Sequence, residues 1–434
     1  MAVTTAVRPA SLTTTVVRLA GAARRERTVF RAGAAIVAAH VLDDTLLQPP
    51  AGTSPADHLV SALVPLALLA LAGWGYPRLR GAGRGALALA LGVIAGVAGV
   101  EAAHYANQVG PSGDDFTGLL SLGAGAVLLG LGATTLWRTR STEGNLAWRY
   151  GRRLLLAVAG VVAFALVLMP VAVAYITTHT ARAVAPDNHL GVPYQDVDFT
   201  TSDGLELRGW YLPSRNGAAV ISFPGRNGPQ RQARMLARHG YGVLLFDRRG
   251  EGQSEGDPNA WGWGGERDVK AAIAWLQRRP DVDPQRIGGI GLSVGGEMML
   301  EAAAETDDLR AVVSEGAGDR AFSDAMDHEM STSERLLSAP GYAVKTAAVA
   351  VFANQAPPPN LKDVVGRIAP RPLLLIAAPN SSNGEDLNRG YHRAAGRPKA
   401  LWEIPESGHV GGIRARPAEY ERRVVGFFDR ALRP

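Results

Sequence analysis

The sequence predicts an α/β domain with a mostly parallel, doubly wound sheet, preceded by an all-α bundle of about five transmembrane helices. Two observations lead to this prediction. Long apolar runs are confined to the chain before residue 177, where they are long enough to cross a bilayer. After residue 195, short strand-like runs alternate with helical segments over about 240 residues, as in a parallel sheet with helices on both faces.

The composition excludes several functional classes. The chain has 45 Lys and Arg residues against 40 Asp and Glu, a formal net charge of +5, but no basic stripe with interleaved aromatic residues. A nucleic-acid partner is therefore not expected. The chain has no cysteine, which excludes disulfides, thiol catalysis and cysteine-ligated zinc.

The apolar runs define the domain boundaries. Residues 1–28 are predicted to form a tail, 29–176 the transmembrane region, 177–194 a polar linker, and 195–434 the α/β domain. The five predicted spans are residues 29–47, 59–76, 85–105, 116–137 and 154–176. The last is an unbroken apolar run of 23 residues, whereas the first is the weakest because charged groups fall near its end.

Loop charges predict the orientation of these spans. The tail and the loops after the second and fourth spans carry arginines, and the loops after the first and third spans carry neither Lys nor Arg. Cytoplasmic loops are enriched in Lys and Arg. We therefore expect a multi-pass protein of the cell membrane with a cytoplasmic N-terminus and, after five spans, an extracytoplasmic α/β domain.

Five ionisable residues fall inside the predicted spans, near the outer face. They are His40, Asp43, Asp44, Glu101 and His104. One hypothesis is a joint metal or proton site, since such groups are costly in a membrane and often functional. The favoured alternative is that they are hydrated helix ends that pair across the bundle.

The motif Gly291-Leu-Ser293-Val-Gly295 organises the α/β domain. A β-rich run over residues 287–292 leads into it, and a helix-forming run over 297–305 follows. In such a strand–turn–helix connection, small residues are needed beside the serine because the turn is tight. The serine hydroxyl then projects at the end of the sheet beside free backbone N–H groups, which suits a nucleophile with an oxyanion site.

Four motifs in order resemble the α/β-hydrolase superfamily, from roughly residue 196 to the C-terminus. They are Phe223-Pro-Gly225, residues 246–254, the Ser293 turn and residues 404–409. The resemblance implies the α/β-hydrolase fold, and it implies that an insertion at about 317–368 caps the pocket. The transmembrane region resembles no family that we can name.

The resemblance also implies roles for individual residues. Ser293 is the expected nucleophile, and His409, in a loop after the last strand, is the expected general base. The backbone N–H groups of Val294 and Arg226 are the expected donors to an oxyanion. No metal site is expected among these residues.

The third member of the triad is harder to assign. The acid usually follows the seventh strand, where this chain has Asn380, which carries no charge. Glu385 is preferred because its long side chain could reach back to the histidine. Asp386, which could instead cap the following helix, and Asp319, after the sixth strand, are the alternatives.

The predicted function is that of a membrane-anchored serine hydrolase that cleaves a carboxylic ester or related acyl bond through an acyl-enzyme on Ser293. No metal or organic cofactor is expected. The expected partners are a small-molecule or lipid-like acyl substrate and the lipid bilayer. The alternatives are a serine peptidase or acyltransferase with the same nucleophile, or a non-catalytic hydrolase-like domain on a binding or transport protein.

Overall fold

The computed structural model describes residues 12–111, 113, 115–140, 145–180, 184, 186–381 and 384–432. The chain forms two compact units. The first comprises Met1–Gln48, Ala62–Ala103 and Pro111–Gly160, and the second comprises Pro49–Ser61, His104–Gly110 and Val161–Pro434. The second unit contains the sheet and the Ser293 motif.

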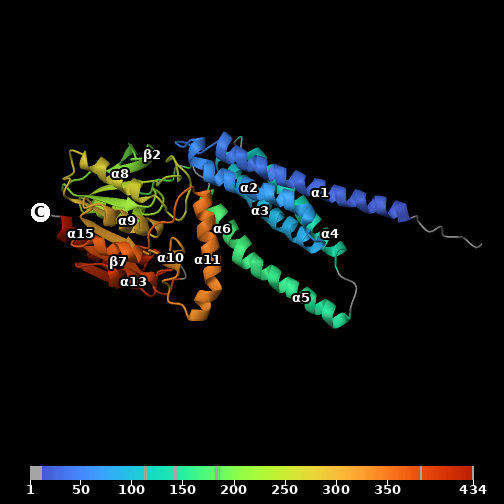
Figure 1. Ribbon diagram of the computed structural model, residues 1–434. Helices are drawn as coiled ribbons and strands as arrows, with labels where there is room; N and C mark the ends of the chain where they lie inside the picture. The colour runs from blue at the N-terminus through green and yellow to red at the C-terminus, as the bar shows by residue number, and fades with distance from the viewer. Residues whose placement is uncertain are drawn as a thin grey trace, which may run out of the picture. The chain divides into compact units, whose positions relative to one another are not determined.

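Long helices make up the N-terminal part (Figure 1). They are α1 (Leu12–Leu42), α2 (Leu59–Gly75), α3 (Gly81–Val109), α4 (Asp115–Arg138) and α5 (Leu146–Ala163), which continues through η4 (Phe164–Leu168) into α6 (Met169–Thr178). Four helical stretches among the described residues are long and apolar enough to cross a membrane: Pro55–Arg78, Gly81–Gln108, Asp115–Arg138 and Leu146–Thr178. The α1 helix is not one of them, so the first predicted span stays a prediction.

The polar end of α1 contacts α4 within the first unit. His40 Nδ1 lies 3.2 Å from Thr117 Oγ1, and the Thr117 hydroxyl donates to Asp43 Oδ2 at 2.8 Å. At Gly33 the two helices are so close that an added Cβ would lie 2.9 Å from Leu128. Within the described ranges, no three His, Asp or Glu side chains are grouped so as to hold a metal ion. His40 and Asp43 thus share a hydrogen-bonding partner on a neighbouring helix.

An eight-stranded sheet forms the centre of the second unit (Figure 1). Its order is β1-β2-β4-β3-β5-β6-β7-β8; β1 and β2 are antiparallel to their neighbours, and the pairs from β4 to β8 are parallel. The strands are Gln195–Thr200, Glu206–Leu212, Ala219–Phe223, Gly242–Phe246, Ile287–Leu292, Ala311–Glu315, Leu373–Ala377 and Lys399–Glu403. The α/β fold class predicted from the alternating pattern is confirmed.

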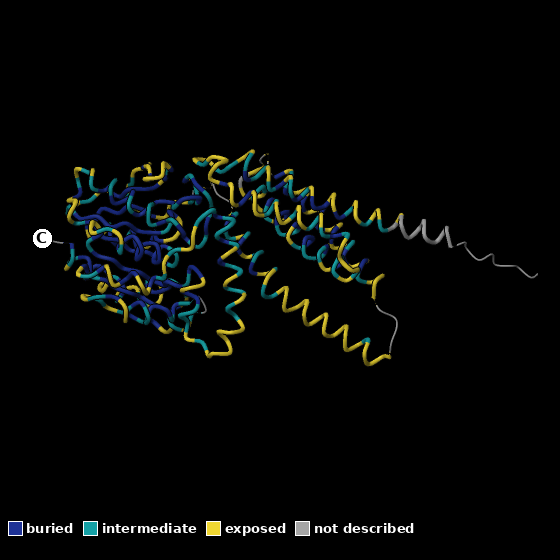
Figure 2. The backbone as a smooth tube through the Cα atoms, viewed as in Figure 1, coloured by how far each residue is buried: buried dark blue, intermediate teal, exposed yellow. Residues whose placement is uncertain are grey.

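Helices cover both faces of this sheet because its central strands are apolar on both sides. On β3, Ile221 packs into one core with residues of α8 (Glu266–Gln277) and α9 (Val294–Glu305). Its neighbour Val220 packs into the other core with residues of α7 (Gln230–Arg238) and α15 (Pro417–Leu432). Figure 2 shows the strands between these layers as buried. Because helices cover both faces of the sheet, the site lies at the carboxyl ends of the parallel strands.

The segment between β6 and β7 contains α10 (Phe322–Ala325), α11 (Thr332–Phe352), α12 (Leu361–Val364) and η5 (Val365–Ile368). Two shorter helices follow later in the chain, α13 (Leu387–Ala394) and α14 (Gly412–Ala415). Within the second unit, α11 lies beside α6 (Figure 1). The rings of Phe352 and Tyr175 meet edge to face at 5.5 Å between centroids. The segment expected to cap the pocket therefore packs against the end of the last apolar helix.

Candidate active site

Ser293 lies at a strained turn between β5 and α9. Its backbone has φ 51° and ψ −128°, a conformation that L-residues rarely adopt. A Cβ on Gly295 would lie 2.3 Å from Cδ of Pro224, and one on Gly291 would lie 2.2 Å from the carbonyl oxygen of Gly295. Both positions therefore require glycine, which is the steric reason for the Gly-x-Ser-x-Gly pattern.

The structure brings Ser293, His409 and Glu385 together. His409 Nε2 lies 2.8 Å from Ser293 Oγ, and His409 Nδ1 lies 2.7 Å from Glu385 Oε1. The other oxygen of Glu385 accepts the backbone N–H of Ala378 at 2.6 Å, at the end of β7. Glu385 exposes only 1% of its surface, and each of its two oxygens has one of these hydrogen-bonding partners. This is the geometry of a nucleophile, a base and an orienting acid.

The two alternative acids lie elsewhere in the site. Asp319 and Asp386 both contact His328, at 3.4 Å from Nε2 and 2.9 Å from Nδ1 respectively. The expectation that Asp386 caps the next helix is wrong: it occupies the N-cap position of α13 but makes no capping bond. Its carboxylate instead accepts from His328 and from the backbone N–H of Glu329 at 3.1 Å.

Of the two expected oxyanion donors, only one is free at the nucleophile. Val294 is the first residue of α9, where a backbone N–H has no acceptor within the helix, and it lines the cavity with Ser293. The N–H of Arg226 donates instead to Asp247 Oδ1 at 2.8 Å, and the Arg226 guanidinium bonds the other oxygen of the same carboxylate. The prediction that Arg226 donates to the oxyanion does not fit this structure, because Asp247 takes both of its donor groups.

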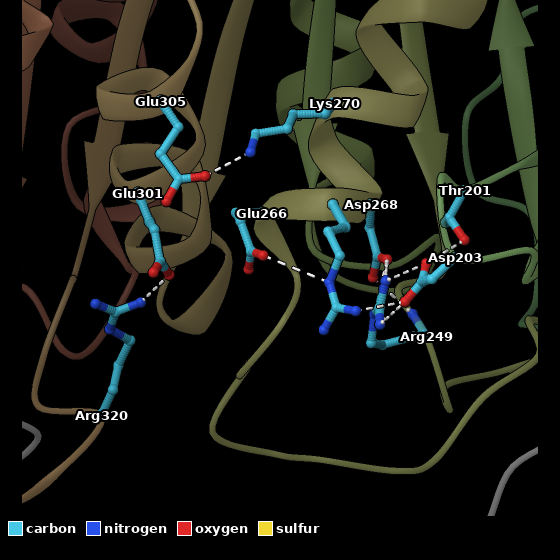
Figure 3. Close-up of polar contacts among 10 residues, drawn as sticks. Thr201, Asp203, Arg249, Glu266, Asp268, Lys270, Glu301, Glu305 and Arg320 are labelled. Atoms are coloured by element: carbon cyan, nitrogen blue, oxygen red, sulfur yellow. Dashed lines mark hydrogen bonds and ion pairs between the residues drawn. The ribbon is translucent and has the colours of Figure 1, made fainter. Parts of the chain in front are cut away.

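Buried ion pairs hold the loops around the site. Arg249, in the loop after β4, contacts Asp268 at 2.7 Å and Asp203 at 2.9 Å (Figure 3). In the same view Arg320, just after β6, pairs with Glu301 of α9. Removing one partner of such a buried pair leaves an uncompensated charge, which is strongly destabilising. The pairs thus fix the β4 loop and the start of the inserted segment to the helices that follow β4 and β5.

A cavity of about 780 Å³ opens at Ser293. Its lining includes Trp261 from the loop before α8, Met330 and Tyr342 from the inserted segment, and the carboxylates of Asp319 and Glu297. This volume suits a small organic substrate.

The surroundings of two cavity carboxylates, Glu297 and Asp319, shift their pKa values in opposite directions. Burial dominates at Glu297. It raises the pKa of Glu297 to about 7, against a hydrogen bond from the backbone N–H of Gly318 at 2.8 Å. Burial also acts to raise the pKa of Asp319, but hydrogen bonding to His328 and the charge of Lys345 outweigh it, so that this pKa is lowered. Asp319 is therefore ionised at neutral pH, and Glu297 is close to its midpoint.

Sequence reasoning missed two residues that organise this site. Glu315, at the end of β6, accepts the N–H of Gly412 at 2.8 Å and the hydroxyl of Tyr420 at 2.6 Å, which fixes the chain just after His409. A carboxylate as the last residue of a buried apolar strand is a local signal that could have identified it. His328 has no such signal, because its acidic partners lie 9 and 58 residues away and no local pattern joins them to it.

The fold and the Ser293 turn define the class: the C-terminal part of the chain is an α/β hydrolase. The chain belongs to the family described as X-Pro dipeptidyl-peptidase (S15 family), which matches residues 176–400. It is similar to the uncharacterized protein YfhR of Escherichia coli (strain K12), with 28% identity over 290 residues that cover 63% of this chain and 93% of the relative. It is also similar to thiohydrolase aneE of Aspergillus aculeatus, with 35% identity over 130 residues that cover 28% of this chain and 41% of the relative.

Among solved structures, the chain is similar to the Pyrococcus furiosus esterase Pf2001. The identity is 24% and the TM-score 0.46, over 58% of this chain and 98% of that one. The family shows that the protein is a hydrolase. Four helical stretches among the described residues of its N-terminal part are long and apolar enough to cross a membrane.

Proposed function

We propose that the protein is a membrane-anchored serine hydrolase that cleaves a carboxylic ester or related acyl bond through an acyl-enzyme on Ser293. The observation that carries this proposal is the hydrogen-bonded chain from Ser293 Oγ through His409 to Glu385 at 2.8 and 2.7 Å. A serine hydroxyl needs an adjacent base to become a nucleophile, and that base needs an orienting partner.

The proposed reaction has two halves. Ser293 Oγ attacks the carbonyl carbon of the ester while its proton passes to His409 Nε2, and the N–H of Val294 donates to the carbonyl oxygen as it gains charge. The C–O bond to the alcohol then breaks, and the alcohol leaves with the proton from His409. In the second half, water attacks the acyl-enzyme while its proton passes to His409, and Ser293 leaves with that proton as the carboxylic acid is released. Glu385 stabilises the imidazolium form of His409 in both halves.

An activity probe tests this proposal. A fluorophosphonate should label the full-length protein in detergent, and Ser293→Ala should abolish both labelling and hydrolysis of a p-nitrophenyl ester, by at least about 1,000-fold. Near-normal turnover by Ser293→Ala would contradict the nucleophile assignment. Absence of labelling in the unmodified protein would favour a non-catalytic binding or transport domain.

A peptidase is the second candidate, and family membership is the observation that favours it. The family is named for X-Pro dipeptidyl-peptidases, and an acyl-enzyme on Ser293 would serve amide bonds equally well. An aminoacyl-prolyl p-nitroanilide, compared with a p-nitrophenyl ester on the same protein, separates the two. A higher kcat/KM on the anilide would establish the peptidase.

The proposal places the hydrolase domain outside the cytoplasm. Contacts within the second unit support this placement: the N–H of Gly256 donates to the carbonyl of Ala51 at 2.9 Å, and His58 lies 3.6 Å from Asp257. We therefore propose that the loop before α2 and the hydrolase domain lie on the same side of the membrane. That side is the outer one in this proposal because the loop before α2, unlike the loop before α3, has no Lys or Arg. The four apolar stretches lie between the loop before α2 and the hydrolase domain, and four crossings return the chain to the side from which it started.

A further inference from the structure

The outward face of α11 is apolar. After the first turn, its exposed residues are Leu336, Leu337, Pro340, Ala343 and Ala347. Leu336 and Leu337 expose 71% and 73% of their surface. A helix on the outside of a water-soluble domain carries polar and charged residues on such a face. The composition of α11 therefore indicates an apolar environment.

The single charged residue in the rest of α11 is turned inward. Lys345 Nζ lies 3.4 Å from Asp319 Oδ2 and 3.9 Å from the ring centroid of Trp261. Asp319 and Trp261 both line the cavity at Ser293. The Lys345 ammonium group thus contacts residues of the cavity wall. The outward face of α11 therefore has no charged residue after Arg335.

The same helix packs against η4 and α6, which form the end of the last apolar stretch of the chain. A Cβ on Gly341 would lie 3.7 Å from Leu166 and 3.8 Å from Pro170, which is ordinary van der Waals contact. Phe352, at the other end of the contact, meets Tyr175. The apolar face of α11 therefore continues the surface of a helix that is apolar enough to cross a bilayer.

The end of this apolar stretch is also bonded to the wall of the cavity. The carbonyl of Thr177 accepts the N–H of Ala260 at 2.8 Å, and the Thr177 hydroxyl accepts Nε1–H of Trp261 at 2.9 Å. Ala260 and Trp261 line the cavity, as does Tyr342 of α11. The cavity is thus held beside the point at which the chain leaves its last apolar stretch.

We infer that α11 lies in the outer leaflet of the bilayer and that the substrate is an acyl ester carried by a membrane lipid, which enters the cavity past α11. This inference rests on the proposed function and specifies its substrate class. The apolar face of α11 contacts the acyl chains, and the cavity on the other side of the helix receives the ester. A lipid substrate then reaches Ser293 without its acyl chain crossing water, which lowers the free energy needed to extract it.

Lipid contact is tested without catalysis. The chain has no cysteine, so a single cysteine can be introduced as Leu336→Cys or as Asp307→Cys and labelled with a bimane fluorophore. Asp307 is the matched control because its side chain is 94% exposed. It precedes β6 and so lies near the amino ends of the parallel strands, whereas the site lies at their carboxyl ends. In phosphatidylcholine nanodiscs, lipids with a nitroxide on the acyl chain should quench the label at position 336 and not at 307. Equal quenching at both positions overturns the inference. A lack of quenching at position 336 also overturns it, and is the result expected if a second copy of the chain covers this face.

The substrate class is tested by kinetics on the full-length protein. Leu336→Gln combined with Leu337→Gln should lower hydrolysis of a fluorogenic diacyl lipid in vesicles by about tenfold or more, because apolar burial is lost. Hydrolysis of water-soluble p-nitrophenyl acetate should change little, since neither leucine lines the cavity. The control Leu336→Met with Leu337→Met keeps the face apolar and should retain both activities. If the double Gln variant loses no activity on the lipid, or loses equal activity on both esters, the lipid role is contradicted. If the unmodified protein hydrolyses neither ester, the proposed function is refuted instead.

Discussion

Glu385 is a buried carboxylate, with one oxygen on His409 and the other on the N–H of Ala378. We expect Glu385→Gln to lower kcat by about a hundredfold or more, because the amide cannot stabilise the imidazolium and presents a donor where an acceptor is needed. Asp319→Asn is the matched control, since that carboxylate faces His328 and Lys345. Steady-state kinetics on a p-nitrophenyl ester measures both. A normal rate for Glu385→Gln with a collapse in Asp319→Asn would move the acid to β6.

His328 joins the inserted segment to the loop that carries Glu385, because it contacts both Asp319 and Asp386. Hydrogen bonding to Asp319 raises the pKa of His328; burial opposes the rise and Asp386 adds to it. A histidine with a raised pKa holds its proton more tightly in the folded state. Its stabilising effect is therefore complete below its ordinary pKa of about 6.5 and is lost as the pH rises through the raised value.

From this we expect His328→Gln to lower the melting temperature of the hydrolase domain most at pH 6 and below. The difference from the unmodified protein should shrink as the pH increases through the raised pKa. Thermal unfolding of the detergent-solubilised full chain, followed at several pH values, measures it. Asp386→Asn should show the same trend more weakly, and a pH-independent difference would show that the charge of His328 does not contribute.

Among the elements, the β5–α9 turn leaves no room for side chains at its glycines. A Cβ on Gly295 would lie 2.4 Å from the backbone nitrogen of Pro224, so Gly295→Ala must displace α9 from the end of β3. We expect a loss of activity of about a hundredfold or more, since a displacement of about 1 Å can cost that much. Gly390→Ala on α13 is the control, because its Cβ would meet no atom within 4 Å. That variant should keep its activity and gain up to about 1 kcal/mol in stability; similar activity in both variants would contradict the steric argument.

The sheet could be predicted from the sequence because its signals are local. The run 242–246 is apolar at every position and is buried at every position as β4, and the glycines around Ser293 mark the turn that they make possible. The oxyanion donors could not be predicted as well. Whether the N–H of Arg226 is free depends on Asp247, 21 residues later, and the sequence of either loop does not show that they meet.

The same limit applies to the inserted segment between β6 and β7. Its sequence shows apolar residues but not which face each one takes. Lys345 reads as a surface lysine, yet the fold turns it toward Asp319 and leaves Leu336 and Leu337 outside. The partner of a side chain in such a segment is decided by how the helices pack, which no local pattern records.

At the scale of the whole molecule, the number of crossings determines where the hydrolase domain lies. The loop before α2 contacts the hydrolase domain. The arginine-bearing loop before α3 is separated from the loop before α2 by one apolar stretch and from the hydrolase domain by three. Because cytoplasmic loops are enriched in arginine, these loops favour the proposed position of the hydrolase domain outside the cytoplasm. In intact cells, a membrane-impermeant maleimide should therefore label Asp187→Cys and should not label Arg80→Cys until the cells are permeabilised. The reverse labelling pattern would show that the hydrolase domain lies on the cytoplasmic side.

The same experiment determines the role of α1. In the proposed orientation, four crossings leave the residues before α2 outside, so the N-terminal end of α1 is cytoplasmic only if α1 itself crosses the membrane. Its packing favours a crossing: Gly33 lies against Leu128 of α4, and Glu26 pairs with Arg84 of α3 at 2.9 Å. We therefore expect Arg24→Cys to be protected in intact cells, as at position 80. Labelling of Arg24→Cys before permeabilisation would show that α1 does not cross and that the protein has four spans.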